Sequence, residues 1–149
     1  MKIEILSIGE CREHRKDWER LFTGYVQFYR REMTSEIAER VWGWLHDPSY
    51  GLEGLMAFAD GKPVGIAHYR MMPRPMAGTE VGFLDDLFVD STVRGGKIGE
   101  LMLQHLGDIG RRRGWAIIRW LTGDDNYRAR TLYDRHSTKT SFNLYEMKL

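Results

Sequence analysis

The segment from Val93 to Gly99 has the residue types of a phosphate-binding turn. It reads Val-Arg-Gly-Gly-Lys-Ile-Gly, between a predicted strand (residues 81–89) and a predicted helix (residues 96–113). Glycines at such a turn let the backbone approach a ligand, and a helix start presents unpaired N–H groups with a positive dipole. It is not a nucleotide P-loop, because no Ser or Thr follows Lys97, nor a dinucleotide fingerprint, because no βαβ unit opens there. A turn whose glycines serve only packing is the alternative.

A second polar segment begins at Asn126, about thirty residues further along the chain. It opens a predicted helix, residues 126–136, with the sequence Asn-Tyr-Arg-Ala-Arg-Thr-Leu-Tyr. Asn126 and Arg130 share one face of this helix, and Tyr133 follows one turn beyond Arg130. A tyrosine on a helix is more often part of a core than a catalyst, so Tyr133 alone would predict packing. Together with Asn126 and the glycine turn, Tyr133 becomes a candidate catalytic residue.

Two adjacent carboxylates, Asp85 and Asp86, lie on the predicted strand before the glycine turn. Strand alternation predicts that their side chains point to opposite faces. Carboxylates at a site attract cationic substrates such as a polyamine, an aminoglycoside or a lysine side chain, and can accept a proton from them. Pairing of one carboxylate with an arginine is the structural alternative. The five histidines show no metal-ligand spacing and Cys11 is the only cysteine, so we expect no metal site.

The elements that must position these residues follow from hydrophobic periodicity and turn signals. Apolar residues at intervals of three and four predict helices, and alternation or short apolar runs predict strands. The dipeptide Asp60-Gly61 predicts a hairpin turn, Pro73 to Gly78 a loop, and Gly114 a left-handed helix end. The predicted strands are residues 2–8, 55–59, 64–72, 81–89, 116–121 and 141–149, and the predicted helices are residues 10–31, 35–46, 96–113 and 126–136. The order βααβββαβαβ predicts an α/β fold, a mixed central sheet with helices on both faces.

Length and composition limit the classes of function. The 149 residues predict a single domain, residues 1–149, and 42% hydrophobic with 29% charged residues is ordinary for a soluble protein. A net charge of +1 gives no general attraction to nucleic acid or to an anionic membrane. No apolar run approaches 18 residues and the N-terminal segment lacks a signal-peptide core, so we expect a cytoplasmic protein without nucleic-acid or membrane partners.

The two polar segments together resemble a known family. The sequences LDDLFVDSTVRGGKIGELML and NYRARTLY are similar to the acetyl-CoA-binding core of the GCN5-related N-acetyltransferase (GNAT) superfamily, over about residues 81–133. The segment WLTGDDNYRARTLYDRHSTKTSFNLYE more narrowly resembles the Hpa-type histone and polyamine acetyltransferases of yeast. The predicted element order agrees with the GNAT fold.

The resemblance implies a role for each segment. Backbone groups of the strand would pair with the pantetheine arm of acetyl-CoA, and N–H groups of the turn would hold its pyrophosphate. Asn126 would bind the pantetheine, and Arg130 on the same face would contact the cofactor. Tyr133 would protonate the departing thiolate, and Asp85, favoured over Asp86, would act as the base. The implied backbone contacts come from Leu87, Phe88, Val89, Arg94, Gly95, Gly96, Lys97, Ile98 and Gly99. The family usually has glycine where Lys97 stands, and a positive φ there would cost a lysine about 1 kcal/mol or more.

The predicted function is therefore acetyl-CoA-dependent N-acetylation of a primary amine by direct transfer. The alternative is a non-catalytic acyl-CoA-binding or protein-interaction module on the same fold. The last predicted strand, residues 141–149, would leave an unpaired sheet edge, and open edges are usually covered. We therefore expect a homodimer formed partly through this segment.

Overall fold

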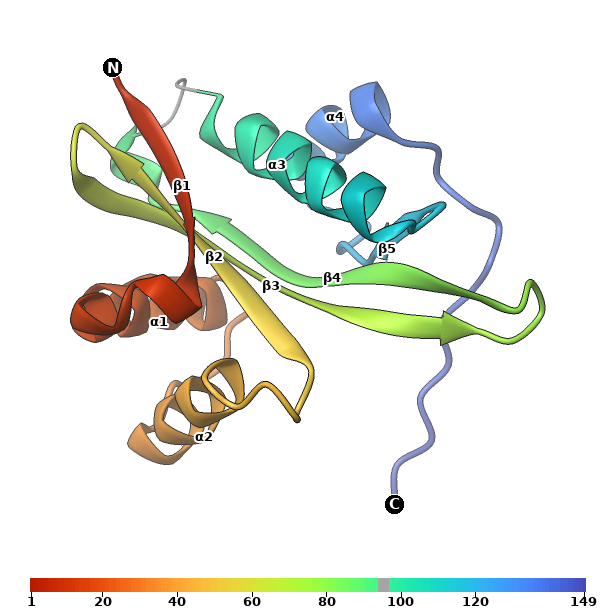
Figure 1. Cartoon of the computed structure of the whole chain (residues 1–149), viewed down its shortest axis with the longest axis horizontal. Coiled ribbons are helices and arrows are strands. Elements are labelled where there is room, and N and C mark those ends of the chain that lie inside the picture. The colour runs from red at the N-terminus through yellow and green to blue at the C-terminus, as the bar shows by residue number, and fades with distance from the viewer. Residues whose placement is uncertain (94–96) are drawn as a thin grey trace.

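A five-stranded mixed sheet forms the centre of the computed structural model, which describes residues 1–93 and 97–149 (Figure 1). The strand order is β1-β2-β3-β4-β5, with antiparallel pairs from β1 to β4 and a parallel pair between β4 and β5. The strands are β1 (Ile3–Ser7), β2 (Leu52–Ala59), β3 (Lys62–Arg74), β4 (Thr79–Val89) and β5 (Ile118–Trp120). The helices are α1 (Arg15–Phe28), α2 (Ser35–Leu45), α3 (Ile98–Arg113) and α4 (Tyr127–His136), with short 3₁₀ helices at Ile8–Glu10, Arg12–His14 and Ser91–Val93.

Two apolar layers bury the two faces of the sheet. Helices α1 and α2 cover one face, where Trp18 and Leu21 pack against Met56 and Ile66 of the strands. Helix α3 covers the other face and packs Met102 and other apolar side chains against β2, β3 and β4 (Figure 1). The predicted α/β fold with helices on both faces of a mixed sheet is therefore confirmed.

Strand β4 carries a β-bulge next to the candidate carboxylates. His68 of β3 pairs with Asp86, but the next residue, Tyr69, pairs with Leu84, so Asp85 is the extra residue of the bulge. The predicted alternation of Asp85 and Asp86 is wrong, because a bulge sets two residues against one and interrupts the period of two. Both carboxylates instead contact side chains on one face of β3, since their partners Arg70 and His68 are two residues apart.

Local signals fixed several element boundaries. The Thr34 hydroxyl accepts a hydrogen bond from the Ile37 N–H at 3.2 Å and caps α2. Gly114 ends α3 with φ +80°, in the left-handed region. The predicted loop at residues 73–78 is shorter than expected, because β3 continues through Arg74 and β4 starts at Thr79.

The predicted final strand is not formed. Residues 138–149 contain no helix or strand and lead away from the body of the molecule (Figure 1). A strand needs a neighbour for its N–H and C=O groups. The described sheet ends at β5, and residues 138–149 do not pair with it. The alternating pattern alone therefore did not produce a strand within one chain.

Within residues 1–93 and 97–149, the structure has no helix long and apolar enough to cross a membrane.

Candidate active site

A cavity opens where β4 and β5 separate. Their parallel pairing runs only from Gly82–Ile118 to Leu84–Trp120, while β4 continues to Val89. Beyond Leu84, the edge of β4 that faced β5 therefore has no strand partner among the residues that the structure describes. The cavity beside this edge has a volume of about 530 Å³ and lies between the end of α1, the start of α3 and helix α4.

Most of the residues predicted for the site line this cavity. They are Asp85, Leu87, Phe88, Val89, Lys97, Ile98, Gly99, Asn126 and Tyr133. Arg94, Gly95 and Gly96, predicted to hold a pyrophosphate, lie outside the residues that the structure describes. Arg130 is not among the lining residues, and its guanidinium donates instead to the carbonyl oxygen of Asp124 at 2.7 Å. The structure therefore brings most of the predicted residues together at one cavity, and this arginine is outside its lining.

Lys97 begins α3 in a left-handed conformation, with φ +56° and ψ +26°. The first turn of α3 reaches the cavity at Ile98, Gly99 and Glu100, so unpaired N–H groups and the positive end of the helix dipole lie beside it. The positive φ that would cost a lysine stability at this position is therefore present. Lys97 adds a cationic side chain to a helix start that already favours an anion.

Three contacts hold α4 against the cavity. The Asn126 side chain accepts a hydrogen bond from the Ala129 N–H at 3.4 Å and caps the helix. His136 Nε2 lies 2.9 Å from Glu100 Oε1 and joins the end of α4 to the first turn of α3. The ring of Tyr133 packs edge-on against Trp120 of β5, with centroids 5.3 Å apart. These contacts place the phenol of Tyr133 at the cavity wall.

The environment of Tyr133 keeps its phenol protonated. Burial, with a smaller contribution from Tyr29, raises the pKa of Tyr133 to about 12. A phenol with this pKa carries its proton throughout the neutral range, so it is suited to donate a proton rather than to accept one.

The two adjacent carboxylates have different partners. Asp85 Oδ2 accepts a hydrogen bond from Arg70 Nε at 2.9 Å in a partly exposed ion pair. Asp86 Oδ2 lies 2.8 Å from Nδ1 of His68, a histidine whose side chain is only 1% exposed. The structural alternative considered for this pair, an arginine contact, is therefore present at Asp85. That contact does not exclude a catalytic role.

Several lining residues were not found from the sequence. The end of α1 contributes three aromatic side chains, Tyr25, Phe28 and Tyr29, and α4 contributes Arg128 and Arg135. The spacing of the α1 aromatics by three and four places them on one face of the helix, which predicts packing in the core. Residues that line a cavity wall have the same spacing, so the pattern alone does not distinguish the two. These two arginines and the predicted Arg130 are on the same helix. The rotation of α4 about its axis relative to the sheet decides which of the three face the cavity.

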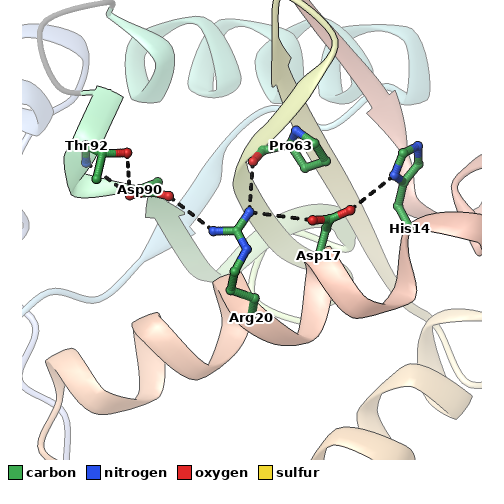
Figure 2. A network of polar contacts seen from close by, with 6 residues as sticks. All are labelled: His14, Asp17, Arg20, Pro63, Asp90 and Thr92. Carbon is green, nitrogen blue, oxygen red and sulfur yellow. Dashed lines mark hydrogen bonds and ion pairs between the residues drawn. The ribbon is translucent and has the colours of Figure 1, made fainter.

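A polar network ties α1 to the end of β4 (Figure 2). Arg20 donates to Asp90 at 3.2 Å and to the carbonyl oxygen of Pro63 at 3.1 Å, and lies 3.7 Å from Asp17. Asp90 accepts hydrogen bonds from the N–H and the hydroxyl of Thr92, each at 3.0 Å. The Thr92 N–H, helped by Arg20, lowers the pKa of Asp90 despite partial burial. The network therefore fixes the backbone just after the cavity edge of β4.

Comparison with known proteins assigns the family. Residues 13–137 match the acetyltransferase (GNAT) family, which is most of the chain. The chain belongs to the GNAT family. The D-amino-acid N-acetyltransferase HPA3 of Saccharomyces cerevisiae is 28% identical to it over 131 residues, which are 87% of this chain and 81% of that protein.

Solved GNAT structures share the fold at low sequence identity. A ribosomal-protein-alanine N-acetyltransferase from Brucella melitensis biovar Abortus 2308 superimposes with a TM-score of 0.83 at 20% identity over the full length of both chains. The AAC(6')-Iy complex with a bisubstrate analogue superimposes with a TM-score of 0.85 at 16% identity, covering 100% of this chain and 99% of that one. A further AAC(6')-Iy structure contains CoA; its TM-score is 0.83 at 16% identity, over 99% and 95% of the two chains.

The GNAT site of this chain has the chemistry that acetyl-CoA requires. The unpaired edge of β4 can pair with the amide groups of a pantetheine arm, as the edge of a sheet pairs with an extended peptide. The start of α3, with Lys97 beside it and Arg128 and Arg135 across the cavity, favours phosphate groups. The described residues therefore fit the cosubstrate of the family.

Proposed function

We propose that this GNAT protein transfers the acetyl group of acetyl-CoA directly to a primary amine. One observation carries the proposal: the unpaired edge of β4 and the phenol of Tyr133 line the same cavity, which also reaches the start of α3. An extended thioester lying along β4 would thus have its phosphates near α3 and its sulfur near α4. A non-catalytic acyl-CoA-binding module would require the edge and the helix start, but not the phenol.

Each lining element would contribute a separate function. Backbone groups of Leu87, Phe88 and Val89 would align the pantetheine arm, and the N–H groups at Ile98 and Gly99 would favour the pyrophosphate. Asn126 would position the arm from the α4 side. Tyr133 would hold its proton for the sulfur that leaves when the amine nitrogen bonds to the acetyl carbon. Acetyl-CoA supplies the activated acyl group, and the chain supplies alignment and proton transfer.

The acceptor amine must lose a proton before it can attack, because an alkyl ammonium has a pKa of about 10.4 and no free lone pair. Asp85, favoured by the sequence, lines the cavity and is a candidate for this proton, directly or through water. Its carboxylate is paired with Arg70, so an incoming ammonium would first have to compete with that guanidinium. The assignment of Asp85 therefore stays a prediction.

The acceptor class is a small primary amine. The relative HPA3 is named for D-amino acids, and the superimposed structures for a ribosomal-protein alanine and for aminoglycosides. The end of α1 adds the aromatic faces of Tyr25, Phe28 and Tyr29 to the cavity, and aromatic faces attract cations. A polyamine, a free amino acid and a lysine side chain all satisfy this chemistry.

Thermal unfolding with and without excess acetyl-CoA tests the proposal first. Ligand at about 100 times its dissociation constant stabilises a protein by about 2.7 kcal/mol, which for this length raises the midpoint by about 5–10 °C. ATP and NAD at the same concentration are the controls. A shift specific to acetyl-CoA is then followed by assays of CoA release with spermidine, D-lysine, L-lysine, a lysine peptide and neamine.

The outcomes separate the alternatives. A thermal shift with CoA release supports the acetyltransferase. A shift without release from any amine in the panel supports the binding module instead. No shift with acetyl-CoA contradicts both.

A further inference from the structure

Three side chains joined by two hydrogen bonds lie beside the bulge of β4, on the α1 side of the sheet. Trp18 of α1 donates its indole N–H to His68 Nε2 at 2.9 Å, and His68 Nδ1 lies 2.8 Å from Asp86 Oδ2. Trp18 is fully buried, His68 is 1% exposed, and the Asp86 side chain is 22% exposed. This series of contacts therefore runs from Trp18 in the core to the carboxylate of Asp86 near the surface.

The tryptophan determines which nitrogen of His68 carries the proton. An indole N–H can only donate, so His68 Nε2 must accept and cannot be protonated while this bond exists. The ring proton then lies on Nδ1, and His68 donates it to Asp86. Asp86 Oδ2 accepts this hydrogen bond, so the orientation of the carboxylate is set from the core.

Asp86 is not one of the residues that line the cavity, but in the strand it lies between two that do. These neighbours are Asp85 and Leu87, and Tyr25 of α1 lines the cavity as well. Burial is the larger cause that raises the pKa of Tyr25, and the Asp86 charge adds to it. The Tyr25 hydroxyl donates to the carbonyl oxygen of Asp85 at 3.4 Å, next to Asp86 in the strand.

The charges around the two carboxylates favour Asp86 as the partner of an ammonium. Asp85 is already paired with the guanidinium of Arg70. In the described part of the chain, Asp86 has no lysine or arginine within ion-pair distance. Its partner His68 accepts a hydrogen bond from Trp18 at Nε2, so the ring carries one proton and no charge. An incoming cation would thus displace no arginine at Asp86.

We propose that Asp86 takes the proton of the acceptor ammonium and that His68 and Trp18 are positioning residues that orient its carboxylate. This inference rests on the proposed function and deepens it. Asp86 accepts one proton from R–NH₃⁺, and the neutral nitrogen forms the N–C bond as the C–S bond breaks. Tyr133 protonates the sulfur and regains a proton from the acylated nitrogen. The products are the amide and CoA-SH, and the proton on Asp86 returns to solvent.

Two substitutions at His68 separate its two hydrogen bonds. In His68→Asn the side-chain amide can replace Nδ1 and keep a donor to Asp86, whereas in His68→Gln it reaches the Nε2 position and keeps an acceptor for Trp18. We expect kcat, measured by CoA release with the best amine of the panel, to fall at least 10-fold further in His68→Gln than in His68→Asn. The KM for acetyl-CoA should be similar in both. The same two substitutions at His105 of α3, which is outside this chain of contacts, are the control.

Equal kcat losses in the two variants would show that His68 only fills space and would overturn the positioning role. Should both fail to fold, Asp86→Asn keeps the proposal testable, because this side chain is partly exposed. We expect Asp86→Asn to lower kcat about 100-fold and Asp85→Asn to lower it less. Wild-type kcat in Asp86→Asn would overturn the proposal.

The histidine tautomer provides a readout that needs no amine. In the ¹⁵N-histidine-labelled full chain with acetyl-CoA, long-range ¹H–¹⁵N spectra should show His68 protonated on Nδ1, and Trp18→Phe should remove that preference. Protonation on Nε2 in the wild type would contradict the inference even if acetylation is observed. Absence of CoA release in the wild type, with the Nδ1 tautomer present, would contradict only the proposed function and the proton transfer that depends on it.

Discussion

In the proposed mechanism, catalysis, as distinct from binding, depends on the phenol of Tyr133. Tyr133→Phe removes the proton donor and keeps the ring that packs on Trp120, so the fold and the cavity should persist. General acids contribute about 10²–10⁴-fold to rate, and we expect kcat to fall in that range while the dissociation constant for acetyl-CoA is unchanged. Because the acid acts in its protonated form and its pKa is about 12, wild-type activity should not lose this donor below about pH 11. A Phe variant with full kcat would remove Tyr133 from the mechanism.

The left-handed backbone at Lys97 combines a conformational cost with a favourable charge. A side chain at φ +56° costs about 1–2 kcal/mol that glycine avoids, partly offset by the greater freedom of glycine in the unfolded chain. Lys97→Gly should therefore raise the free energy of unfolding by up to about 1 kcal/mol and weaken acetyl-CoA binding by losing the cation near the phosphates. Lys97→Ala is the matched control, which loses the charge and keeps the strain. Chemical denaturation and calorimetric titration measure the two effects, and equal stability of the two variants would contradict the strain argument.

At the scale of elements, the packing of α1 on β4 shapes the cavity. Gly24 of α1 lies under the ring of Phe88, and a Cβ built there would be 2.9 Å from the ring. Gly24→Ala should push Phe88 toward the cavity that it lines and raise the dissociation constant for acetyl-CoA several-fold, measured by calorimetric titration. Gly43→Ala in α2 is the control, because its Cβ would meet no atom within 4 Å and should only favour the helix by about 1 kcal/mol. Unchanged binding in Gly24→Ala would contradict this account.

Elements that depend on local signals were predicted well, and features set by contacts between elements were not. The hairpin turn at Asp60-Gly61 and the Gly114 helix end are specified by neighbouring residues, and both were predicted. The bulge at Asp85 depends on the register between β3 and β4, which no local pattern records. The choice of Arg128 and Arg135 over Arg130 depends on how α4 is rotated against the sheet.

At the scale of the whole molecule, the C-terminal segment contributes neither a helix or strand nor buried side chains to the fold of one chain. Residues 138–149 have no regular structure, and five large apolar side chains there are at least 66% exposed. These are Phe142, Leu144, Tyr145, Met147 and Leu149. Exposed apolar residues that cluster in one segment indicate an interaction surface. The alternating pattern predicts a strand in this segment, but a strand forms only where a neighbouring strand accepts and donates its backbone hydrogen bonds. Within one chain the segment has no such neighbour.

We propose that the partner is a second copy, so that the C-terminal segment of each chain pairs with the sheet of the other. The outer edge of β5 ends the described sheet and offers unpaired backbone groups, while the segment brings both backbone groups and apolar side chains. The full chain should therefore sediment as a dimer at tens of micromolar, and Phe142→Ser combined with Tyr145→Ser should shift it toward monomer because the buried apolar area falls. Asn143→Ser, in the same segment, is the control and should remain dimeric. A monomeric wild-type chain at this concentration would contradict the proposal, and a dimer that persists in the double variant would place the interface elsewhere.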